Sequence, residues 1–462
     1  MESNRNPLHE SRRISPMLQD FRGDVILPGD DAYEVARRIL MGQFDRHPEV
    51  IFRPADAMDI ARIVGYASDT GRELAVRSGG HSLAGHSVSE GGIVLDLRQV
   101  NSLEIDPKSR SAWAGSGLTA GEYTRAAALQ GLVTGFGDTP TVGIGGLTLG
   151  GGVGYLVRRN GLTIDELLAA EVVTADGQVV HTDKESHPDL FWAIRGGGGN
   201  FGVVSRFKFR LHSIDQVLGG MLILPATVEV IERFVAESMQ APDELSSILT
   251  VMPAPPMPFL PAEVVGKPVV LAMMLYSGSS MEEGARVLAP FRAIAKPIVD
   301  MIHPMHYPEI YPPEGPEMHP LVVADSLFID KVDRSDAQAI VDAVIHSDAP
   351  MRTVQLRVLG GAMARVPSEA TAFPHRTAKI MVNIVSFYSG DADIDLRKEW
   401  VAQLADTLHQ GYNGAYVNFL GESSPEKIRE AYTEECWRKL TRIKKQYDPA
   451  NLFHMNQNIP PQ

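Results

Sequence analysis

Residues 139–155 read TPTVGIGGLTLGGGVGY and contain seven of the 42 glycines in this 462-residue chain. The stretch is weakly polar, but glycines at this density rule out a membrane-spanning helix. Glycine is also concentrated in AVRSGGHS at residues 75–82 and in RGGGGNFG at residues 195–202. Successive glycines allow backbone N–H groups to converge on an anion without Cβ clashes. Three such segments predict a cradle for an extended ligand that carries phosphate groups.

Gly197, Gly199 and Gly202 match the GxGxxG pattern of dinucleotide-binding proteins. That fingerprint requires the glycines to open a helix. Here they precede VVSRFKFRL at residues 203–211, in which apolar and polar residues alternate as in a strand. We therefore reject a Rossmann fold. The chain contains no P-loop, HExxH or GxSxG motif either.

Charge and cysteine content exclude several classes of protein. The formal net charge of −14 argues against binding to nucleic acid or to an anionic membrane surface. The one cysteine, Cys436, excludes an internal disulfide and multi-cysteine metal sites. No metal is expected, because His303, His306 and His319 lack acidic or cysteine partners at suitable spacing. The start of the chain is polar and shows no signal peptide, so we expect a soluble cytoplasmic protein.

The composition of the sequence changes twice along the chain, which predicts domain boundaries near residues 212 and 411. Short strands alternate with helices before the first boundary, and one helix is expected at residues 54–67. Proline-rich loops and alternating strands between the boundaries predict an α/β domain on a mostly antiparallel sheet. The strand candidates of this middle part are residues 247–252, 269–276, 353–359 and 380–387, and its helix candidates are residues 228–238 and 281–289.

The C-terminal part is expected to form a separate unit. Residues 414–419 (GAYVNF) predict a strand, and residues 425–447 predict a charged helix. We interpret the charges of this helix as a solvated face. Cys436 lies in the helix without a nearby histidine or second thiol, so its expected role is structural.

Two histidines follow the glycines of the first segment. His81 stands at the tip of the glycine turn, and His86 lies five residues later. An imidazole in such a place can act as a nucleophile or as the attachment point of a cofactor, whereas the ordinary alternative is a solvated loop histidine. The residues alone do not choose between His81 and His86.

Four long motifs occur in order along the chain: RSGGHS at residues 77–82, PTVGIGGLTLGGGVGYLVRRNGLTID at 140–165, DLFWAIRGGGGNFGVV at 189–204 and YDPANLFHMNQNIPP at 447–461. Together they resemble the berberine bridge enzyme-like branch of the vanillyl-alcohol oxidase/p-cresol methylhydroxylase superfamily, and within it the bacterial members similar to 6-hydroxynicotine oxidase. The resemblance implies an α+β fold. A two-part FAD-binding domain of the PCMH type would be formed by residues 1–212 and 412–462, with an inserted α/β substrate domain at residues 213–411.

The same resemblance implies FAD as the cofactor, linked covalently from the imidazole of His81 to the 8α-methyl carbon of the flavin. Doubly linked members carry a cysteine just before the proline of PTVG. This chain has Thr139 there, so a single link is expected. The residues that the resemblance places around the cofactor are Arg77, Ser78, Gly79, Gly80, His81, Ser82, Thr139, Gly143, Gly145, Gly146, Gly150, Gly151, Gly154, Val204, Asn456 and Asn458.

A second departure from the family concerns catalysis. In many members the strand matching residues 416–419 ends in a tyrosine or histidine that takes the hydroxyl proton of the substrate. This chain has Phe419 there, which cannot act as a base. A neutral amine can lose a hydride without such a base, so an amine is the favoured substrate and an alcohol comes next. The candidate catalytic residues are Tyr416, Asn383 and Tyr155.

We therefore expect an oxidase that takes a hydride from a carbon next to nitrogen or oxygen of a small molecule and reduces O2 to H2O2. The alternative is a dehydrogenase that passes electrons to an acceptor other than O2. A third hypothesis is a flavin-binding or ligand-carrying protein without turnover. On the candidate strand at 380–387, Asn383 shares a face with Met381 and Val385 by alternation. A slip of one residue would turn Asn383 away from the site.

Overall fold

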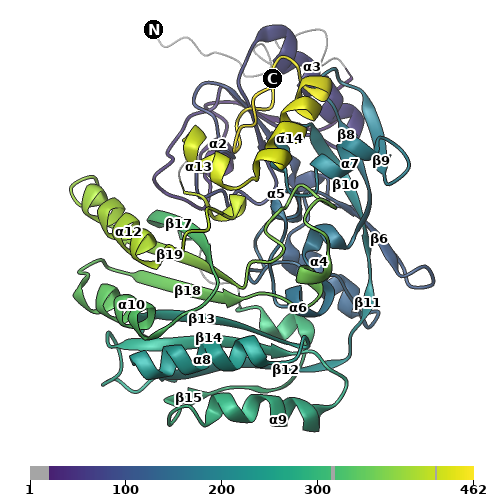
Figure 1. The fold of residues 1–462 in the computed structure, drawn as a ribbon. Coiled ribbons are helices and arrows are strands. Elements are labelled where there is room, and N and C mark those ends of the chain that lie inside the picture. The colour runs from purple at the N-terminus through teal and green to yellow at the C-terminus, as the bar shows by residue number, and fades with distance from the viewer. Residues whose placement is uncertain (1–19, 314–317, 422–423) are drawn as a thin grey trace.

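The computed structural model describes residues 20–313, 318–421 and 424–462 and has a mixed α+β architecture. Figure 1 shows two lobes, of which one is formed by the beginning and the end of the chain and the other by its middle. Within the described ranges, no helix is both long and apolar enough to cross a membrane. The predicted α+β class is confirmed.

The first sheet contains strands β1 (Asp24–Ile26), β2 (Val50–Arg53), β4 (Ile93–Asp96) and β3 (Leu74–Arg77), in that spatial order. Strands β2, β4 and β3 run parallel, and helix α3 (Ala57–Thr70) packs beside them. Asp56 caps the first turn of α3 by accepting bonds from two backbone N–H groups, and Gly71 ends the helix in the left-handed conformation. The helix predicted at residues 54–67 is therefore confirmed, with its end three residues later.

The second sheet is antiparallel and contains β5 (Leu103–Asp106), β6 (Ser111–Gly115), β10 (Val203–Arg210), β8 (Leu167–Val173) and β9 (Val179–Asp183), in that spatial order. Strand β10 follows the glycines of residues 195–202, which confirms that they lead into a strand and not into a Rossmann helix. At Gly202 the backbone has a φ of +150°, and a Cβ would lie 2.6 Å from the carbonyl oxygen of Val173. No larger residue fits at this approach to β8.

The glycine-rich residues 139–155 do not form one continuous loop. Helix α5 (Ile144–Gly150) forms within them because Ile144, Leu147 and Thr148 recur at helical spacing and are buried. A second short helix, α6 (Val157–Asn160), follows the glycines. The N-terminus of α5 therefore comes directly after the loop at residues 139–143.

The middle lobe is built on an antiparallel sheet, as predicted. The spatial order is β15-β12-β14-β13-β18-β19-β17, and β16 also pairs with β12. Each of the four predicted strands coincides with an observed one. The strands are β12 (Gln216–Pro225), β13 (Leu245–Pro253), β14 (Pro268–Tyr276), β15 (Val299–Asp300), β16 (His303–His306), β17 (Leu321–Ile329), β18 (Arg352–Val358) and β19 (Ile380–Tyr388).

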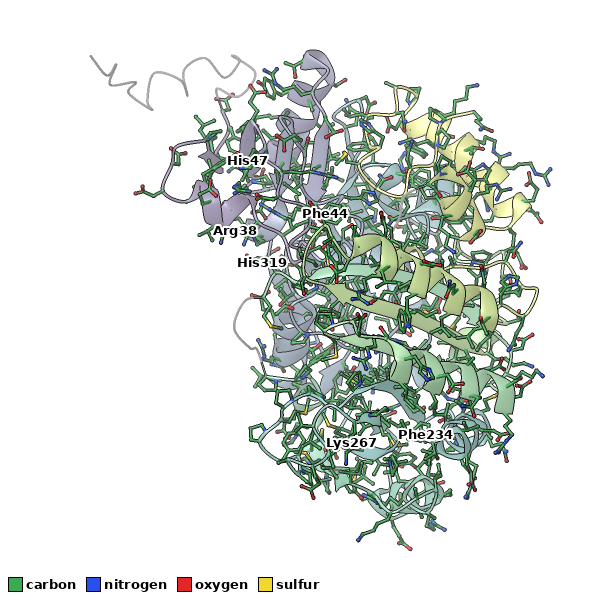
Figure 2. All side chains as sticks on the ribbon, turned by 90° about the vertical axis from the view of Figure 1, so that its left-hand side faces the viewer. Arg38, Phe44, His47, Phe234, Lys267 and His319 are labelled. Carbon is green, nitrogen blue, oxygen red and sulfur yellow. The ribbon has the colours of Figure 1, made fainter. Side chains whose placement is uncertain are left out.

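Four helices cover one face of this sheet and bury a large apolar core against it. Phe234 of one helix, which is labelled in Figure 2, meets Phe291 of another at a ring-centroid distance of 5.0 Å. The opposite face of β18 and β19 is directed toward the first lobe. The four helices are α8 (Val228–Gln240), α9 (Met281–Arg292), α10 (Arg334–His346) and α12 (Ile394–Leu408).

The two lobes also meet where the chain enters β17. His319, labelled in Figure 2, has its Nδ1 2.7 Å from the carbonyl oxygen of Ile39. The N–H of Gly42 donates to the carbonyl oxygen of Pro320 at 3.0 Å. These contacts join the middle lobe to residues 39–42.

The C-terminal part differs from its prediction in two places. The predicted strand at 414–419 is wrong, because the N–H of Tyr416 donates to the side chain of Ser326 at 3.2 Å and residues 417–419 form a 3-10 turn. The predicted helix at 425–447 divides into α13 (Pro425–Glu430) and α14 (Glu434–Tyr447). Thr433 separates them because its side chain caps the first turn of α14.

Helix α14 is not solvated on all sides, which corrects the interpretation of its charges. Lys444 is fully buried and donates to Asp448 Oδ2 at 2.6 Å. It also donates to the carbonyl oxygens of Asn200 and Phe453, both at 2.9 Å. Burial lowers the pKa of Lys444, and the carboxylate of Asp448 opposes this effect. The helix thus connects the glycine segment 195–202 to the C-terminal tail.

Candidate active site

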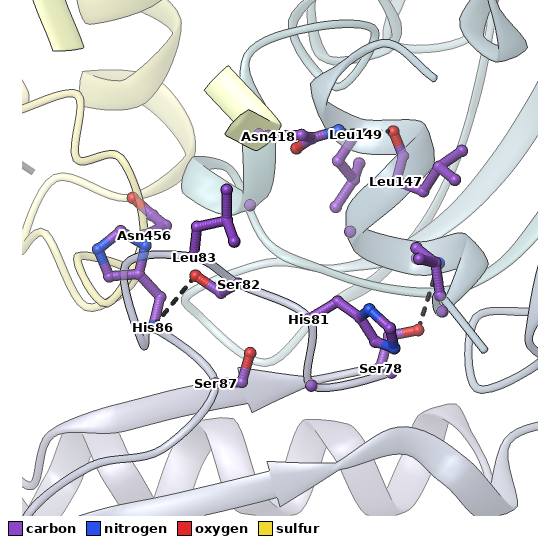
Figure 3. Close-up of a pocket in the computed structure, with 18 of the residues that line it drawn as sticks. Ser78, His81, Ser82, Leu83, His86, Ser87, Leu147, Leu149, Asn418 and Asn456 are labelled. Atoms are coloured by element: carbon purple, nitrogen blue, oxygen red, sulfur yellow. Dashed lines mark hydrogen bonds between the residues drawn. The ribbon is translucent and has the colours of Figure 1, made fainter. Parts of the chain in front are cut away.

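A cavity of about 450 Å³ lies where the two lobes meet. Its wall contains parts of all three glycine-rich segments, residues of β18 and β19, and residues 453 and 455–457 of the C-terminal tail. Figure 3 shows one region of it, with side chains from the first glycine segment, helix α5 and the tail. Segments that are far apart in the sequence therefore converge on one space.

Most residues predicted around the cofactor lie in this wall, namely Ser78, Gly79, Gly80, His81, Ser82, Thr139, Gly143, Gly145, Gly146, Val204 and Asn456. The structure places the other predicted residues outside the wall, and these are Arg77, Gly150, Gly151, Gly154 and Asn458.

Two glycine loops touch each other at the cavity. A Cβ on Gly79 would lie 2.2 Å from the backbone nitrogen of Gly143, and a Cβ on Gly143 would lie 2.1 Å from Ser78 Oγ. Ser78 Oγ in turn accepts a bond from the N–H of Gly145 at 3.3 Å. The loops therefore pack backbone against backbone, which is the arrangement that lets N–H groups face an anion.

His81 and His86 both line the cavity and are both half-buried. Burial lowers the pKa of each imidazole to about 4, so both are neutral at physiological pH. In Figure 3 His81 lies near Ser78, whereas His86 lies at the opposite end of the view near Asn456. His81 Nε2 is 3.2 Å from Thr141 Oγ1, and the backbone N–H of His86 donates to Ser82 Oγ at 3.3 Å.

Arg77 lies outside the wall because strand alternation turns it away. Leu74 and Val76 of β3 line the cavity, so the residue after Val76 faces the opposite side. There Arg77 donates to Asp96 Oδ2 at 3.2 Å and to the carbonyl oxygen of Ala36 at 2.6 Å. Burial raises the pKa of Asp96, but the charges around it, Arg77 first, outweigh burial and bring the pKa to about 2. Arg77 therefore anchors the end of β3, directly before the glycine turn at residues 78–82, on the side away from the cavity.

Three predicted glycines behind α5 are required for packing. A Cβ on Gly150 would lie 2.2 Å from Asn418 Oδ1, and one on Gly154 would lie 1.5 Å from the carbonyl oxygen of Phe136. Gly151 has a φ of +136° and faces the ring of Tyr416. Gly150 and Gly151 allow the C-terminal segment to approach the end of α5 closely, and Gly154 allows the chain to pass close to Phe136.

Tyr416 lies in the cavity wall, and its hydroxyl oxygen accepts two bonds. The donors are the N–H of Gly152 at 2.9 Å and the side-chain amide of Asn418 at 3.0 Å. Burial raises the pKa of Tyr416, and the bond from Gly152 opposes this effect. The tyrosine is therefore protonated at neutral pH and is held in place by both donors.

Replacing Tyr416 by phenylalanine is expected to lower the free energy of unfolding by about 1–3 kcal/mol, because the buried N–H of Gly152 loses its acceptor and Asn418 keeps only the carbonyl oxygen of Leu147. Urea unfolding of the natural protein and the variant measures this change. Unchanged stability together with a hundredfold or greater loss of turnover would contradict the expectation and would give Tyr416 a direct part in the reaction.

Asn383 also lies in the wall, together with Val385 of the same strand. Ile380, Val382 and Ile384 pack instead into the helix-covered core, so the face predicted from alternation is the observed one. Met381 shares that face but is buried in a neighbouring apolar cluster. The side-chain oxygen of Asn383 is buried and has no partner among the described residues. Asn383 therefore lines the cavity with an amide whose oxygen has no hydrogen-bond donor among the described residues.

Tyr155 lies outside the wall, unlike the other two candidate catalytic residues. Its ring packs 6.4 Å from that of Tyr311 in a separate buried cluster. Burial raises the pKa of Tyr155, and the nearby carboxylate of Asp138 adds to the effect. A structural role behind the cavity fits this position better than contact with a substrate.

Sequence reasoning missed an ion pair in the wall. Arg357 of β18 donates to Asp138 Oδ2 at 2.6 Å, and its Nε donates to Gln355 Oε1 at 2.8 Å. Its guanidinium also lies 5.1 Å from the ring centroid of Phe419. Strand alternation could have placed Arg357 in the wall. Gln355 pairs with Asn383 across β18 and β19, and Arg357 is two residues further along β18 and therefore on the same face. Phe419, which stands where many family members have a catalytic base, thus places its ring against the guanidinium of Arg357.

The residues of the wall fit a dinucleotide such as FAD. Asn456 and Ser116 line the cavity, and Asn456 Oδ1 and Ser116 Oγ are buried without a partner among the described residues. Asn458 Oδ1, just behind the wall, has none either. Two glycine loops present backbone there that any Cβ would block. Partnerless buried polar atoms of this kind are expected to bond to a ligand.

Comparisons with known proteins agree with this site. Residues 48–183 match the family described as FAD binding domain, and residues 415–460 match the family described as Berberine and berberine like. The chain is 30% identical over 467 residues to (R)-6-hydroxynicotine oxidase of Paenarthrobacter nicotinovorans, covering 98% of this chain and 99% of that protein.

Two solved structures show the same fold. The 6-hydroxy-D-nicotine oxidase from Arthrobacter nicotinovorans superposes with a TM-score of 0.86 at 29% identity, over 97% of this chain and 99% of that one. The xylooligosaccharide oxidase from Myceliophthora thermophila, at 22% identity, superposes with a TM-score of 0.85 over 97% and 99% and supports the fold alone. The family matches at both ends of the chain and the full-length relative lead to one conclusion: this chain belongs to the berberine bridge enzyme-like family of FAD-linked oxidoreductases.

Proposed function

We propose that the protein is an FAD-dependent oxidase that takes a hydride from a carbon next to nitrogen or oxygen of a small molecule and reduces O2 to H2O2. The observation that carries this proposal is the cavity itself, in which the glycine cradle and the polar face of β18 and β19 share one wall. The division of the chain at residues 212 and 411 into a two-part FAD domain and an inserted substrate domain belongs to the same proposal.

The flavin is attached through His81 alone in this proposal. The supporting observation is a neutral, half-buried imidazole that lines the cavity at the end of the glycine turn, because a neutral ring nitrogen has the lone pair that a covalent bond requires. Thr139 lines the cavity where doubly linked relatives have cysteine, and a hydroxyl group cannot form the corresponding thioether.

FAD, when bound, supplies the acceptor for the hydride. The described wall offers no strong base for a substrate proton. The pKa of His81 and that of His86 are about 4, that of Tyr416 is raised by burial, and Asp138 is paired with Arg357. A substrate that needs no base is therefore favoured, and a neutral amine meets this requirement better than an alcohol. Val153, Val385 and Phe419 line the same wall with apolar groups and limit access of water.

The first test combines the purified protein with cyclic amines and with aromatic alcohols in the absence of oxygen. We expect the yellow colour of the flavin to bleach faster with an amine, and air to restore it with one H2O2 for each substrate oxidised. Bleaching that air restores only slowly, but that an artificial acceptor restores quickly, would support a dehydrogenase instead. No bleaching by any amine or alcohol would contradict the proposal.

The pH dependence offers a further prediction. Only the neutral form of an amine has a lone pair to push, so kcat/KM is expected to rise up to the pKa of the amine, which is about 10 for an alkyl ammonium group, and to stay flat above it. Initial rates measured for two amines of different basicity check this point. The inflection should move with the amine. An inflection at the same pH for both would indicate a titrating base in the protein and would contradict the prediction.

A further inference from the structure

The polar side chains on the substrate-domain side of the cavity stand on one face of two paired strands. Gln355 and Arg357 of β18, and Asn383 and Val385 of β19, all line the cavity. Gln355 pairs with Asn383, so Arg357 is the diagonal neighbour of Asn383 and within reach of the same small molecule.

The charge of Arg357 is already balanced. Asp138 Oδ2 accepts from its Nη2 at 2.6 Å, and Gln355 fixes its Nε, so the guanidinium has a defined orientation. The side chain of Arg357 is 5% exposed and that of Asp138 is 23% exposed. A pair this far from bulk water interacts strongly, and breaking it would leave a partly buried charge without a partner.

No other charged side chain lines the described wall. His81 and His86 also face the cavity, and burial lowers the pKa of each to about 4, so they carry no charge at neutral pH. The protein side of the cavity is therefore electrically neutral as a whole. A charged ligand group placed next to the pair would lose its hydration without gaining an unpaired counter-charge.

The same face still has unused hydrogen-bonding capacity. Asn383 lines the cavity and its Oδ1 has no donor among the described residues, so its side-chain amide has an unused acceptor for a ligand. A guanidinium has five N–H donors, and those not directed to Asp138, Gln355 or the carbonyl oxygen of Val153 can meet a ligand acceptor. The wall thus presents one acceptor beside a donor.

We propose that the Arg357–Asp138 pair and Asn383 together determine specificity, by selecting an uncharged group that carries a hydrogen-bond donor beside an acceptor, such as an amide or lactam edge. Carboxylates are rejected because Asp138 already holds the guanidinium, and cations are rejected because Arg357 already holds the carboxylate. This inference rests on the proposed function, since it assigns the substrate class of the same cavity.

Three probes of nearly equal shape and different charge test the idea: benzoate, benzamide and benzamidinium. Their dissociation constants are measured on the holoprotein by titration calorimetry, with the change in flavin absorbance as a second signal. We expect benzamide to bind at least about tenfold more tightly than either ion, which is the size of effect that one unmatched buried group produces.

Variants of the pair should change the order of the three probes. Asp138→Asn leaves Arg357 unpaired and is expected to make benzoate the tightest of the three, whereas Arg357→Met is expected to favour benzamidinium. The double variant removes both charges and should again prefer benzamide. Asn383→Leu keeps the ion pair and should weaken benzamide by about tenfold without changing the binding of the ions.

The outcomes separate this inference from the proposed function. If benzoate or benzamidinium binds the natural holoprotein as tightly as benzamide, or if no probe binds, the inference is wrong even where amines are oxidised. If benzamide binds most tightly and Asn383→Leu weakens it, the inference stands even where no amine or alcohol bleaches the flavin. These two measurements remain decisive if a variant of the ion pair does not fold.

Discussion

His81→Ala is expected to abolish the covalent attachment of the flavin completely. His81 lies at the end of the glycine turn, lines the cavity, and is neutral because burial lowers its pKa to about 4. Alanine removes both ring nitrogens of His81 while leaving the backbone of the glycine turn unchanged. Without the link, FAD would be held by the loops alone and would separate from the protein in acid.

Acid precipitation measures this effect directly. The pellet of the natural protein should stay yellow, and mass spectrometry should find the mass of FAD on the His81 peptide alone. The pellet of His81→Ala should be colourless, with the flavin in the supernatant. His86→Ala is the matched control, because His86 has a similarly lowered pKa but lies at the other end of the close-up in Figure 3. A yellow His81→Ala pellet, or flavin on the His86 peptide, would refute a single link through His81.

The sequence predicted those parts of the site that depend on local order. Strand alternation placed Asn383 and Val385 on the cavity face of β19, and the glycine motifs placed Ser78 to Ser82 in the wall. The same alternation explains why Arg77 faces away, since Val76 before it lines the cavity. A prediction that followed the motif alone included Arg77. A prediction that also followed the strand would have left it out.

Contacts between segments far apart in the sequence could not be predicted from strand alternation or from the glycine motifs. Arg357 and Asp138 are 219 residues apart and come from different lobes, so no local pattern pairs them. Tyr155 lies beside the glycines in sequence, yet its ring turns toward Tyr311. The segment at 414–419 was predicted as a strand, but the N–H of Tyr416 donates to the side chain of Ser326. In each case a partner far away in the chain decides the local structure.

Lys444→Met is expected to lower the free energy of unfolding by about 3–5 kcal/mol, because it leaves the buried carboxylate of Asp448 without its cation. Both side chains are fully buried, and the ammonium group also donates to the carbonyl oxygens of Asn200 and Phe453. Methionine keeps the length and apolar character of the side chain, so the loss comes from charge and hydrogen bonds. Urea unfolding followed by circular dichroism measures it.

Lys445→Met is the matched control. Lys445 is the next residue on the same helix and is exposed, so its replacement should change the free energy of unfolding by less than about 0.5 kcal/mol. Equal effects of the two substitutions would contradict the expectation. Asn200 belongs to the glycine segment whose Gly198 and Gly199 line the cavity, and Phe453 lines it from the tail. Lys444 therefore holds together two sides of the proposed FAD site, and Lys444→Met should also lose any flavin that is not covalently held sooner than Lys445→Met does.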